Sequence, residues 1–189
     1  QTVVFDKTGT LTTGRFVVNA VKPVEGVSER ELLKLAATIE QRSSHPLARS
    51  IVAHAREQGI APSEAADVKV LEGLGIQAIV DGKPASAGSL KILPADAERL
   101  VAALEEGDET LPVVPVYIVS ENRLLGAVYL TDEIRPEAAK TVTRLRQLGL
   151  QHVAMLTGAR RRTAELVARA VGCDEVFADR YHSSQIRSA

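Results

Sequence analysis

The last third of the chain alternates short apolar runs with helical patterns, and this alternation constrains the fold more than any other feature. Pro136 opens a helical pattern that Gly149 closes, and a strand is expected at 152–156. A second helix at 163–171 and a second strand at 175–178 continue the series. Alternation of this kind is typical of a parallel sheet that binds ligands at the carboxyl ends of its strands.

The opening run at 2–5 is also apolar, and it ends on Asp6. We expect this run to join the parallel sheet as a further strand. The sheet domain is then discontinuous, because residues 1–13 and 131–189 lie on either side of an inserted segment. The sequence therefore predicts an α/β fold with a Rossmann-like parallel-sheet domain and an inserted mixed α+β domain at residues 14–130.

The inserted domain is expected to be built on an antiparallel sheet. A capping box at Ser28 and a proline at position 46 mark the starts of two helices. Residues 81–82 and 121–122 are predicted to form the turns of two hairpins. The expected helices span 29–40, 46–59 and 96–105, and the expected strands span 16–21, 68–71, 76–80, 83–87, 113–119 and 124–130.

Charge and composition narrow the choice of partners. The chain has 189 residues, with 23 Lys plus Arg against 24 Asp plus Glu and a net charge of −1. This balance gives no basic surface for nucleic acid and no cationic face for an anionic membrane. The single Cys173 excludes an internal disulfide framework and fits a reducing compartment. No apolar run approaches the roughly 18–20 residues that a membrane helix needs.

The residues after the opening strand have the chemistry to hold a phosphoryl group. Residues 6–12 read DKTGTLT, so a carboxylate at a strand end is followed by Thr and Gly residues whose N–H groups can point inward. Asp6 can attack phosphorus to form an aspartyl phosphate, provided that a metal ion and cations relieve the charge repulsion. An ordinary polar turn is the alternative, and the length of the string disfavours it.

The string DKTGTLT resembles the phosphorylation motif of the P-type ATPases, a branch of the haloacid dehalogenase superfamily. The resemblance implies that ATP and Mg2+ are the cofactors and that Asp6 takes the γ-phosphate. It assigns Lys7, Thr8 and Thr157 to catalysis, and it assigns Asp6 and the Thr8 carbonyl to the magnesium ion. Soluble phosphatases of the superfamily carry a second Asp at the position of Thr8, as the acid/base that hydrolyses the intermediate. Because this chain has Thr8 at that position, an aspartyl phosphate at Asp6 is expected to persist.

Residues 43–48, SSHPLA, resemble the His-Pro motif of the nucleotide-binding domain in heavy-metal-transporting P-type ATPases. An imidazole at a helix start can pack against an adenine ring, and the resemblance implies this for His45. Glu40 lies five places earlier, as in the family, and could accept a hydrogen bond from the adenine amino group. For His45 alone, a surface residue or a helix cap is the alternative.

Glycine motifs imply further nucleotide contacts. The sequence GLGI resembles the family's Gly-x-Gly turn, which assigns Gly73, Gly75 and Ile76 to nucleotide binding. Missing side chains would let the backbone approach the nucleotide there, and an ordinary β-turn is the alternative. Gly88 carries over from a Gly-Asn pair of the family, although Ser89 replaces the Asn.

Near the end of the chain the resemblance is mixed. MLTG at 155–158 matches a family motif whose Thr hydroxyl holds a phosphate oxygen, which assigns Thr157 and Gly158 to the nucleotide. The family has an Asp where this chain has Ala159, and its phosphate-binding Lys would fall at Gln185. The chain also ends before the family's magnesium-binding Gly-Asp-Gly-x-Asn-Asp segment, so we expect a truncated phosphorylation domain. Nucleotide binding without efficient self-phosphorylation is therefore expected.

The resemblance implies the cytoplasmic domain of an integral membrane pump. Its actuator and transmembrane domains, and the heavy-metal cation that it transports, would lie outside this chain. The residues around 43–48 lean toward zinc, cadmium or cobalt over copper. Two alternatives remain: a degenerate nucleotide-binding module, if Ala159 and Gln185 are losses of function, and a soluble aspartate-nucleophile phosphatase, which Thr8 disfavours. Adenine nucleotide is the expected small-molecule partner, and no nucleic acid is expected.

Overall fold

Two compact units make up the part of the chain that the computed structural model describes, which is residues 2–105, 113–159 and 161–178. The first unit takes in the described parts of residues 1–15 and 132–189. The second takes in the described parts of residues 16–109 and 113–131. Each unit has its own sheet and its own hydrophobic core.

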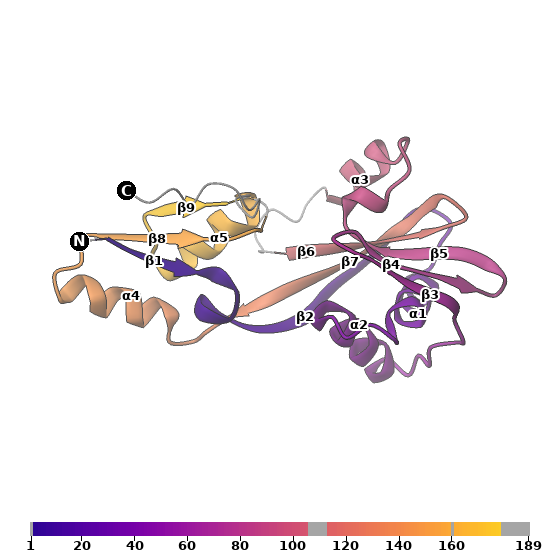
Figure 1. Cartoon of the computed structure of the whole chain (residues 1–189), viewed down its shortest axis with the longest axis horizontal. Helices are drawn as coiled ribbons and strands as arrows, with labels where there is room; N and C mark the ends of the chain where they lie inside the picture. Colours follow the sequence, from indigo (N-terminus) through magenta and orange to yellow (C-terminus); the bar gives the residue numbers. More distant parts are fainter. Residues whose placement is uncertain (1, 106–112, 160, 179–189) are drawn as a thin grey trace. The chain divides into compact units, whose positions relative to one another are not determined.

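A three-stranded parallel sheet forms the first unit, in the order β1-β8-β9 (Figure 1). Its strands are β1 (Thr2–Asp6), β8 (His152–Leu156) and β9 (Glu175–Phe177). Thr2 pairs with His152 and Asp6 pairs with Leu156, so β1 and β8 end together. The prediction that the opening run joins the parallel sheet is confirmed.

Two helices pack on this sheet, α4 (Ala138–Gln147) and α5 (Arg161–Val171). Met155 of β8 is fully buried in one cluster with residues of both helices, and Phe5 of β1 packs against that cluster. The helical and strand patterns of the last third are therefore confirmed. The first helix is shorter than predicted at both ends, because residues 136–137 form a turn and Gly149, with φ +96°, lies beyond its last residue.

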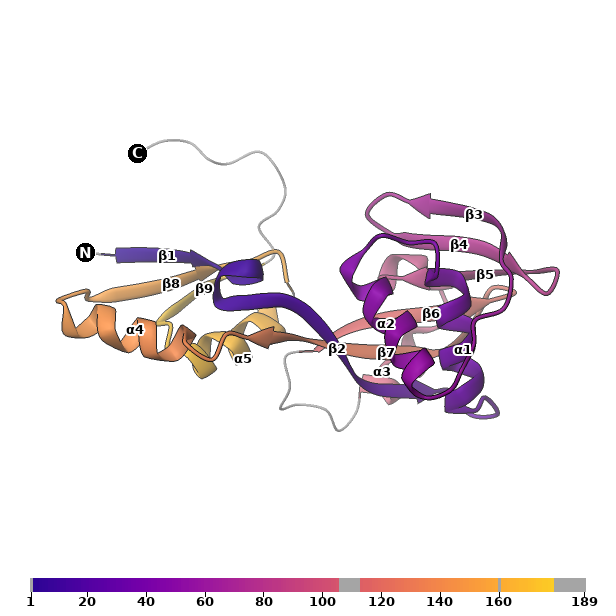
Figure 2. The same cartoon turned by 90° about the horizontal axis from the view of Figure 1, so that it is seen from below.

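A six-stranded sheet forms the second unit, in the order β2-β7-β6-β5-β4-β3 (Figure 2). Its strands are β2 (Thr12–Pro23), β3 (Ala66–Leu71), β4 (Gly75–Val80), β5 (Lys83–Gly88), β6 (Val113–Ser120) and β7 (Arg123–Ile134). Neighbouring strands from β3 to β7 are antiparallel. Both predicted hairpins are confirmed, and positive φ angles at residues 81–82 and 121–122 form their turns.

Helices cover the two faces of this sheet, with α1 and α2 on one face and α3 on the other (Figure 1). Their bounds are α1 (Glu29–Glu40), α2 (Pro46–Glu57) and α3 (Glu98–Glu105), and a short 3-10 turn spans Leu90–Ile92. The predicted capping box is present, because the Ser28 and Glu31 side chains each bond the other's backbone N–H. None of the helices in the described parts of the chain is both long and apolar enough to cross a membrane.

Candidate functional site

Asp6 and Thr157 lie at the same edge of the parallel sheet. Asp6 is the last residue of β1 and is exposed, and its strand partner is Leu156. Thr157 follows at once, and its N–H donates to the Phe177 carbonyl at 2.9 Å. The carboxyl ends of parallel strands are where this class of sheet binds ligands. The sheet therefore brings the Asp6 carboxylate and the Thr157 hydroxyl to the edge where this class of sheet binds ligands.

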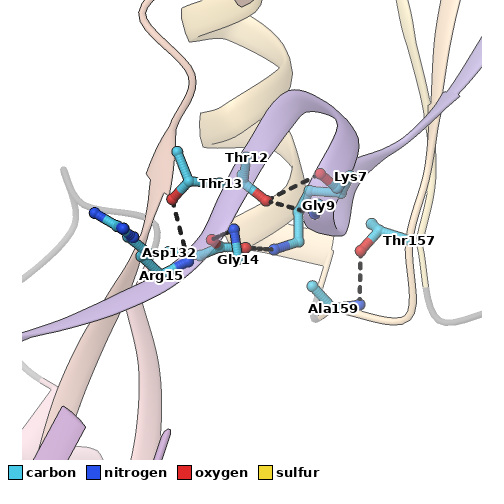
Figure 3. A network of polar contacts seen from close by, with 9 residues as sticks. All are labelled: Lys7, Gly9, Thr12, Thr13, Gly14, Arg15, Asp132, Thr157 and Ala159. Carbon is cyan, nitrogen blue, oxygen red and sulfur yellow. Dashed lines mark hydrogen bonds and ion pairs between the residues drawn. The ribbon is translucent and has the colours of Figure 1, made fainter. Parts of the chain in front are cut away.

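The Thr157 hydroxyl is fixed by the turn that follows β8. Its Oγ1 accepts a hydrogen bond from the Ala159 N–H at 3.1 Å, and the residue is only 3% exposed (Figure 3). A hydroxyl that accepts this bond still has its own proton to donate. Thr157 can therefore donate to a phosphate oxygen, while Gly158 beside it is exposed.

The loop Lys7–Leu11, which follows Asp6, is a closed turn and not a continuous helix. Thr8 is extended (φ −78°, ψ 121°), and Gly9 has φ +80°, a conformation that favours glycine. The Thr12 hydroxyl closes the loop, because it accepts from the Gly9 N–H at 3.2 Å and donates to the Lys7 carbonyl at 3.0 Å (Figure 3). The loop therefore presents Asp6 and Thr8 to solvent in a fixed geometry.

A buried ion pair between Lys7 and Asp132 fixes the loop Lys7–Leu11. The Lys7 Nζ lies 3.0 Å from one carboxylate oxygen of Asp132, and the two residues are 4% and 3% exposed. The other oxygen of Asp132 accepts from the Gly14 N–H at 3.2 Å (Figure 3). Lys7 was expected among the catalytic residues, and its ammonium group is held by Asp132.

Arg135 supports the same loop through two further bonds. Its backbone N–H donates to the Leu11 carbonyl at 2.9 Å, and its guanidinium donates to the Gly9 carbonyl at 3.0 Å. Asp132, Arg135 and Thr12 were not among the predicted site residues, although residues 130–136 match the family's hinge and Thr12 ends the DKTGTLT string. The signal was available in part, since Asp132 and Arg135 lie where the chain re-enters the predicted parallel-sheet domain.

In the second unit, Glu40 and His45 lie at the two ends of the short connection between α1 and α2. Glu40 ends α1 and is 7% exposed. Burial raises the pKa of Glu40 to about 7, and a hydrogen bond from Ser43 opposes the rise. His45 caps α2, because its Nδ1 accepts from the Leu47 N–H at 3.2 Å, and its side chain is exposed. The helix-cap alternative for His45 is therefore present, and it leaves the face of the ring accessible.

The backbone geometry of the second unit explains why glycine occupies positions 73, 75 and 88. Gly75 and Gly88 are partners in the β4–β5 ladder. A Cβ added at Gly75 would lie 2.1 Å from the Ala87 carbonyl oxygen, so both strands need their glycine to approach. Gly73 has φ +70° in an exposed turn, and a Cβ there would meet nothing. Ile76 is 3% exposed and packs in the core.

A hollow of about 680 Å³ opens elsewhere in the second unit. It is lined by Gln41 and Arg42 after α1, by residues 62–66 and by the β4–β5 turn. None of the residues predicted to bind nucleotide lines it. The nucleotide hypothesis therefore rests on the groups around Glu40 and His45 and not on this hollow.

Few side chains in the described residues are grouped so that they could coordinate a magnesium ion. They contain no group of three or more His, Cys, Asp or Glu side chains that could hold a metal ion. Mg2+ is commonly held by one or two carboxylates together with substrate phosphates and water. The exposed Asp6 carboxylate and the Thr8 carbonyl oxygen fit that pattern. Gln185, where a phosphate-binding Lys was expected, lies outside the described residues.

The sequence profile of the haloacid dehalogenase-like hydrolases matches residues 1–188. The chain belongs to this family. Among curated proteins it is similar to the copper-exporting P-type ATPase B of Archaeoglobus fulgidus, at 36% identity over 182 residues. It is also 38% identical over 176 residues to the cadmium, zinc and cobalt-transporting ATPase of Bacillus subtilis. These alignments cover 95% and 93% of this chain, and 26% and 24% of the relatives.

Comparison with solved structures finds the same class of proteins. A zinc-transporting PIB-type ATPase in the E2.Pi state matches with a TM-score of 0.71 and 37% identity, over 95% of this chain and 29% of that one. The N-domain of HMA8, a copper-transporting P-type ATPase, matches 59% of this chain with a TM-score of 0.52 and 28% identity, and 97% of that N-domain is covered. The resemblance to heavy-metal P-type ATPases is confirmed, and this chain spans about a quarter of the curated relatives' length.

Proposed function

We propose that the chain is the nucleotide-binding and phosphorylation region of a heavy-metal-transporting P-type ATPase. It would lie on the cytosolic side of an integral membrane protein, act with actuator and transmembrane domains, and drive export of a metal cation. The proposal depends on the position of Asp6, which is exposed at the carboxyl end of β1. The loop Lys7–Leu11 that follows it is fixed by hydrogen bonds and an ion pair to Thr12, Asp132 and Arg135.

The proposed reaction is transfer of the γ-phosphoryl group of ATP to Asp6. A carboxylate oxygen of Asp6 attacks the γ-phosphorus, the bond from that phosphorus to the bridging oxygen breaks, and ADP leaves. Thr157 would donate a hydrogen bond to a γ-phosphate oxygen. Mg2+ would neutralise phosphate charge when bound, and Asp6 and the Thr8 carbonyl are the groups to hold it.

Thr8 supports a pump over a soluble phosphatase. A phosphatase of this superfamily needs a second carboxyl group to activate the water that hydrolyses the acyl phosphate. Thr8 cannot take that proton, so the acyl phosphate would last long enough to drive a conformational change. Phosphatase activity on small phosphate esters would revive the phosphatase alternative.

The second unit is proposed to bind the adenine end of the nucleotide. The exposed ring of His45 would stack on the base, and Glu40 would accept a hydrogen bond from the adenine amino group.

We propose that residues 1–13 and 131–189 form the phosphorylation domain and that residues 14–130 form the nucleotide-binding domain. The proposed transported metal is zinc, cadmium or cobalt rather than copper.

We expect the 189-residue chain to bind ATP but to transfer its phosphate inefficiently. Ala159 stands where the family has an Asp, and loss of one preorganised electrostatic group typically costs about 10²–10³ in rate. A degenerate binding module is the second candidate, and Ala159 is the observation that favours it. The chain should be incubated with γ-labelled ATP and Mg2+ and quenched in acid. Little label should remain on protein, and stoichiometric acid-stable label on Asp6 would contradict this expectation.

A further inference from the structure

Thr12 is at the centre of the hydrogen bonds that close the loop Lys7–Leu11, and it is fully buried. Its hydroxyl donates to the Lys7 carbonyl at 3.0 Å and accepts from the Gly9 N–H at 3.2 Å (Figure 3). Its backbone N–H also donates to the Lys7 carbonyl. Removal of the hydroxyl would therefore leave the Lys7 carbonyl with a donor, but it would take away the acceptor that Thr12 offers to the Gly9 N–H.

The bond to the Gly9 N–H sets the direction of the Thr8 carbonyl, because both groups belong to one peptide unit. The described part of the chain contains no cis peptide bond, and in a planar trans peptide the C=O and N–H groups point in opposite directions. The Gly9 N–H points at the buried Thr12 hydroxyl, and Thr8 is exposed. The Thr8 carbonyl is therefore directed to the side of the loop opposite Thr12.

Arg135 holds the next part of the loop but not this peptide. Its guanidinium donates to the Gly9 carbonyl at 3.0 Å, and its N–H donates to the Leu11 carbonyl at 2.9 Å. Gly9 has φ +80°, and a glycine backbone can turn to other conformations at little cost. The Thr12 hydroxyl is therefore the contact that keeps the Thr8–Gly9 peptide in one orientation.

We propose that Thr12 is a positioning residue for the magnesium ligands, an inference that rests on the proposed function above. The Thr12 hydroxyl holds the Thr8–Gly9 peptide so that the Thr8 carbonyl oxygen is turned outward and is available as a ligand next to Asp6 in the chain. Thr12 touches neither the ion nor the substrate and acts through this peptide. Groups that orient a metal ligand in this way typically contribute about 10–100-fold to metal affinity.

The test follows the proposed ligands while the 189-residue chain is titrated with magnesium chloride at constant ionic strength. Carbon NMR of the Thr8 carbonyl and of the Asp6 carboxyl group reports each ligand separately. Thr12→Val keeps the branched shape but lacks the hydroxyl, so its magnesium midpoint should rise about tenfold and its Thr8 shift should shrink. Thr12→Ser keeps the hydroxyl and should keep the wild-type midpoint. Thr13→Val is the matched control and should also match the wild type, because the Thr13 hydroxyl accepts from the Arg15 N–H, outside the loop.

Hydrogen exchange of the Gly9 amide tests the bond itself, even if Thr12→Val does not fold. In the wild type this amide should exchange at least about tenfold more slowly than an unprotected amide. In folded Thr12→Val it should lose that protection. The Arg135 amide, which donates to the Leu11 carbonyl, should keep its protection in both chains and so show that the rest of the loop is intact.

An unprotected Gly9 amide in the wild type would overturn the proposal, and so would an unchanged midpoint and Thr8 shift in Thr12→Val. An equal loss in Thr13→Val would also overturn it, because the effect would then belong to β2 in general. If neither Asp6 nor Thr8 shifts in the wild type, the magnesium part of the proposed function fails, and this proposal fails with it. The two failures are distinguishable, because a failure of this proposal alone leaves the wild-type Asp6 and Thr8 shifts intact.

Discussion

Replacement of Asp132 by alanine is expected to lower the free energy of unfolding of the first unit by about 3–5 kcal/mol, because it leaves the ammonium of Lys7 buried without its partner. The Lys7 side chain is 4% exposed and cannot reach water without moving the loop that follows Asp6. The Gly14 N–H also loses its acceptor. This variant should therefore disturb the loop Lys7–Leu11 as well as the stability of the unit.

A double-mutant cycle tests this prediction. Lys7→Met in the Asp132→Ala background removes the orphaned charge and should recover much of the loss. Glu133→Ala, at an exposed position beside Asp132, is the matched control and should stay within about 0.5 kcal/mol of the wild type. Hydrogen exchange of the β1 and β8 amides reports the first unit alone. A loss of less than about 1 kcal/mol in Asp132→Ala would mean that the pair behaves as a solvated one.

Glu40 should make the second unit less stable as the pH rises. Its pKa is 4.5 in an ordinary environment and about 7 in the folded chain, so between these values the folded state binds the proton more tightly than the unfolded state. Stability is therefore unaffected by Glu40 below pH 4.5, falls through the interval, and is lower by about 3 kcal/mol at pH 8. This cost is the physical consequence of burying a carboxyl group.

Glu40→Gln should remove that pH dependence. The amide keeps nearly the same shape and cannot ionise, so the variant should be more stable than the wild type at pH 8 and similar to it at pH 4.5. Glu57→Gln, at the exposed end of α2, is the control and should keep the wild-type slope. Denaturant unfolding at several pH values, followed through amides of α1, gives the measurement. An equal slope in wild type and Glu40→Gln would contradict the assignment.

Local patterns predicted the elements well. The alternation in the last third, together with an apolar run ending on Asp6, was sufficient for the parallel sheet. The middle strand β8 is buried at 153–155, whereas the edge strand β1 has one exposed face, with Val4 53% exposed. The turns at 81–82 and 121–122 were readable because Asp81, Gly82 and Asn122 are residue types that tolerate positive φ, and each adopts it. Resemblance then supplied the candidate site, and the structure places each of its described residues.

Contacts between distant residues could not be predicted in the same way. Asp132 meets Lys7 across 125 positions, and no local pattern names that partner. Gly75 and Gly88 looked like ligand-contact glycines, whereas strand register gives them a structural reason, since each admits the other's backbone. Ser43 was part of a motif, but its bonds to the Glu40 backbone carbonyl and from the His45 N–H depend on how the α1–α2 connection turns.

The proposed nucleotide site is tested most directly by an NMR titration of the 189-residue chain with ATP, ADP and AMP. We expect all three nucleotides to bind and to shift the resonances of Glu40, His45, Gly73 and Gly75. Similar affinities for the three would show that the adenine end dominates binding. His45→Asn keeps a good helix cap but removes the ring, and it should bind ATP about tenfold more weakly at unchanged stability. Failure of all three nucleotides to bind at millimolar concentration would contradict the nucleotide site and the function proposed for this chain.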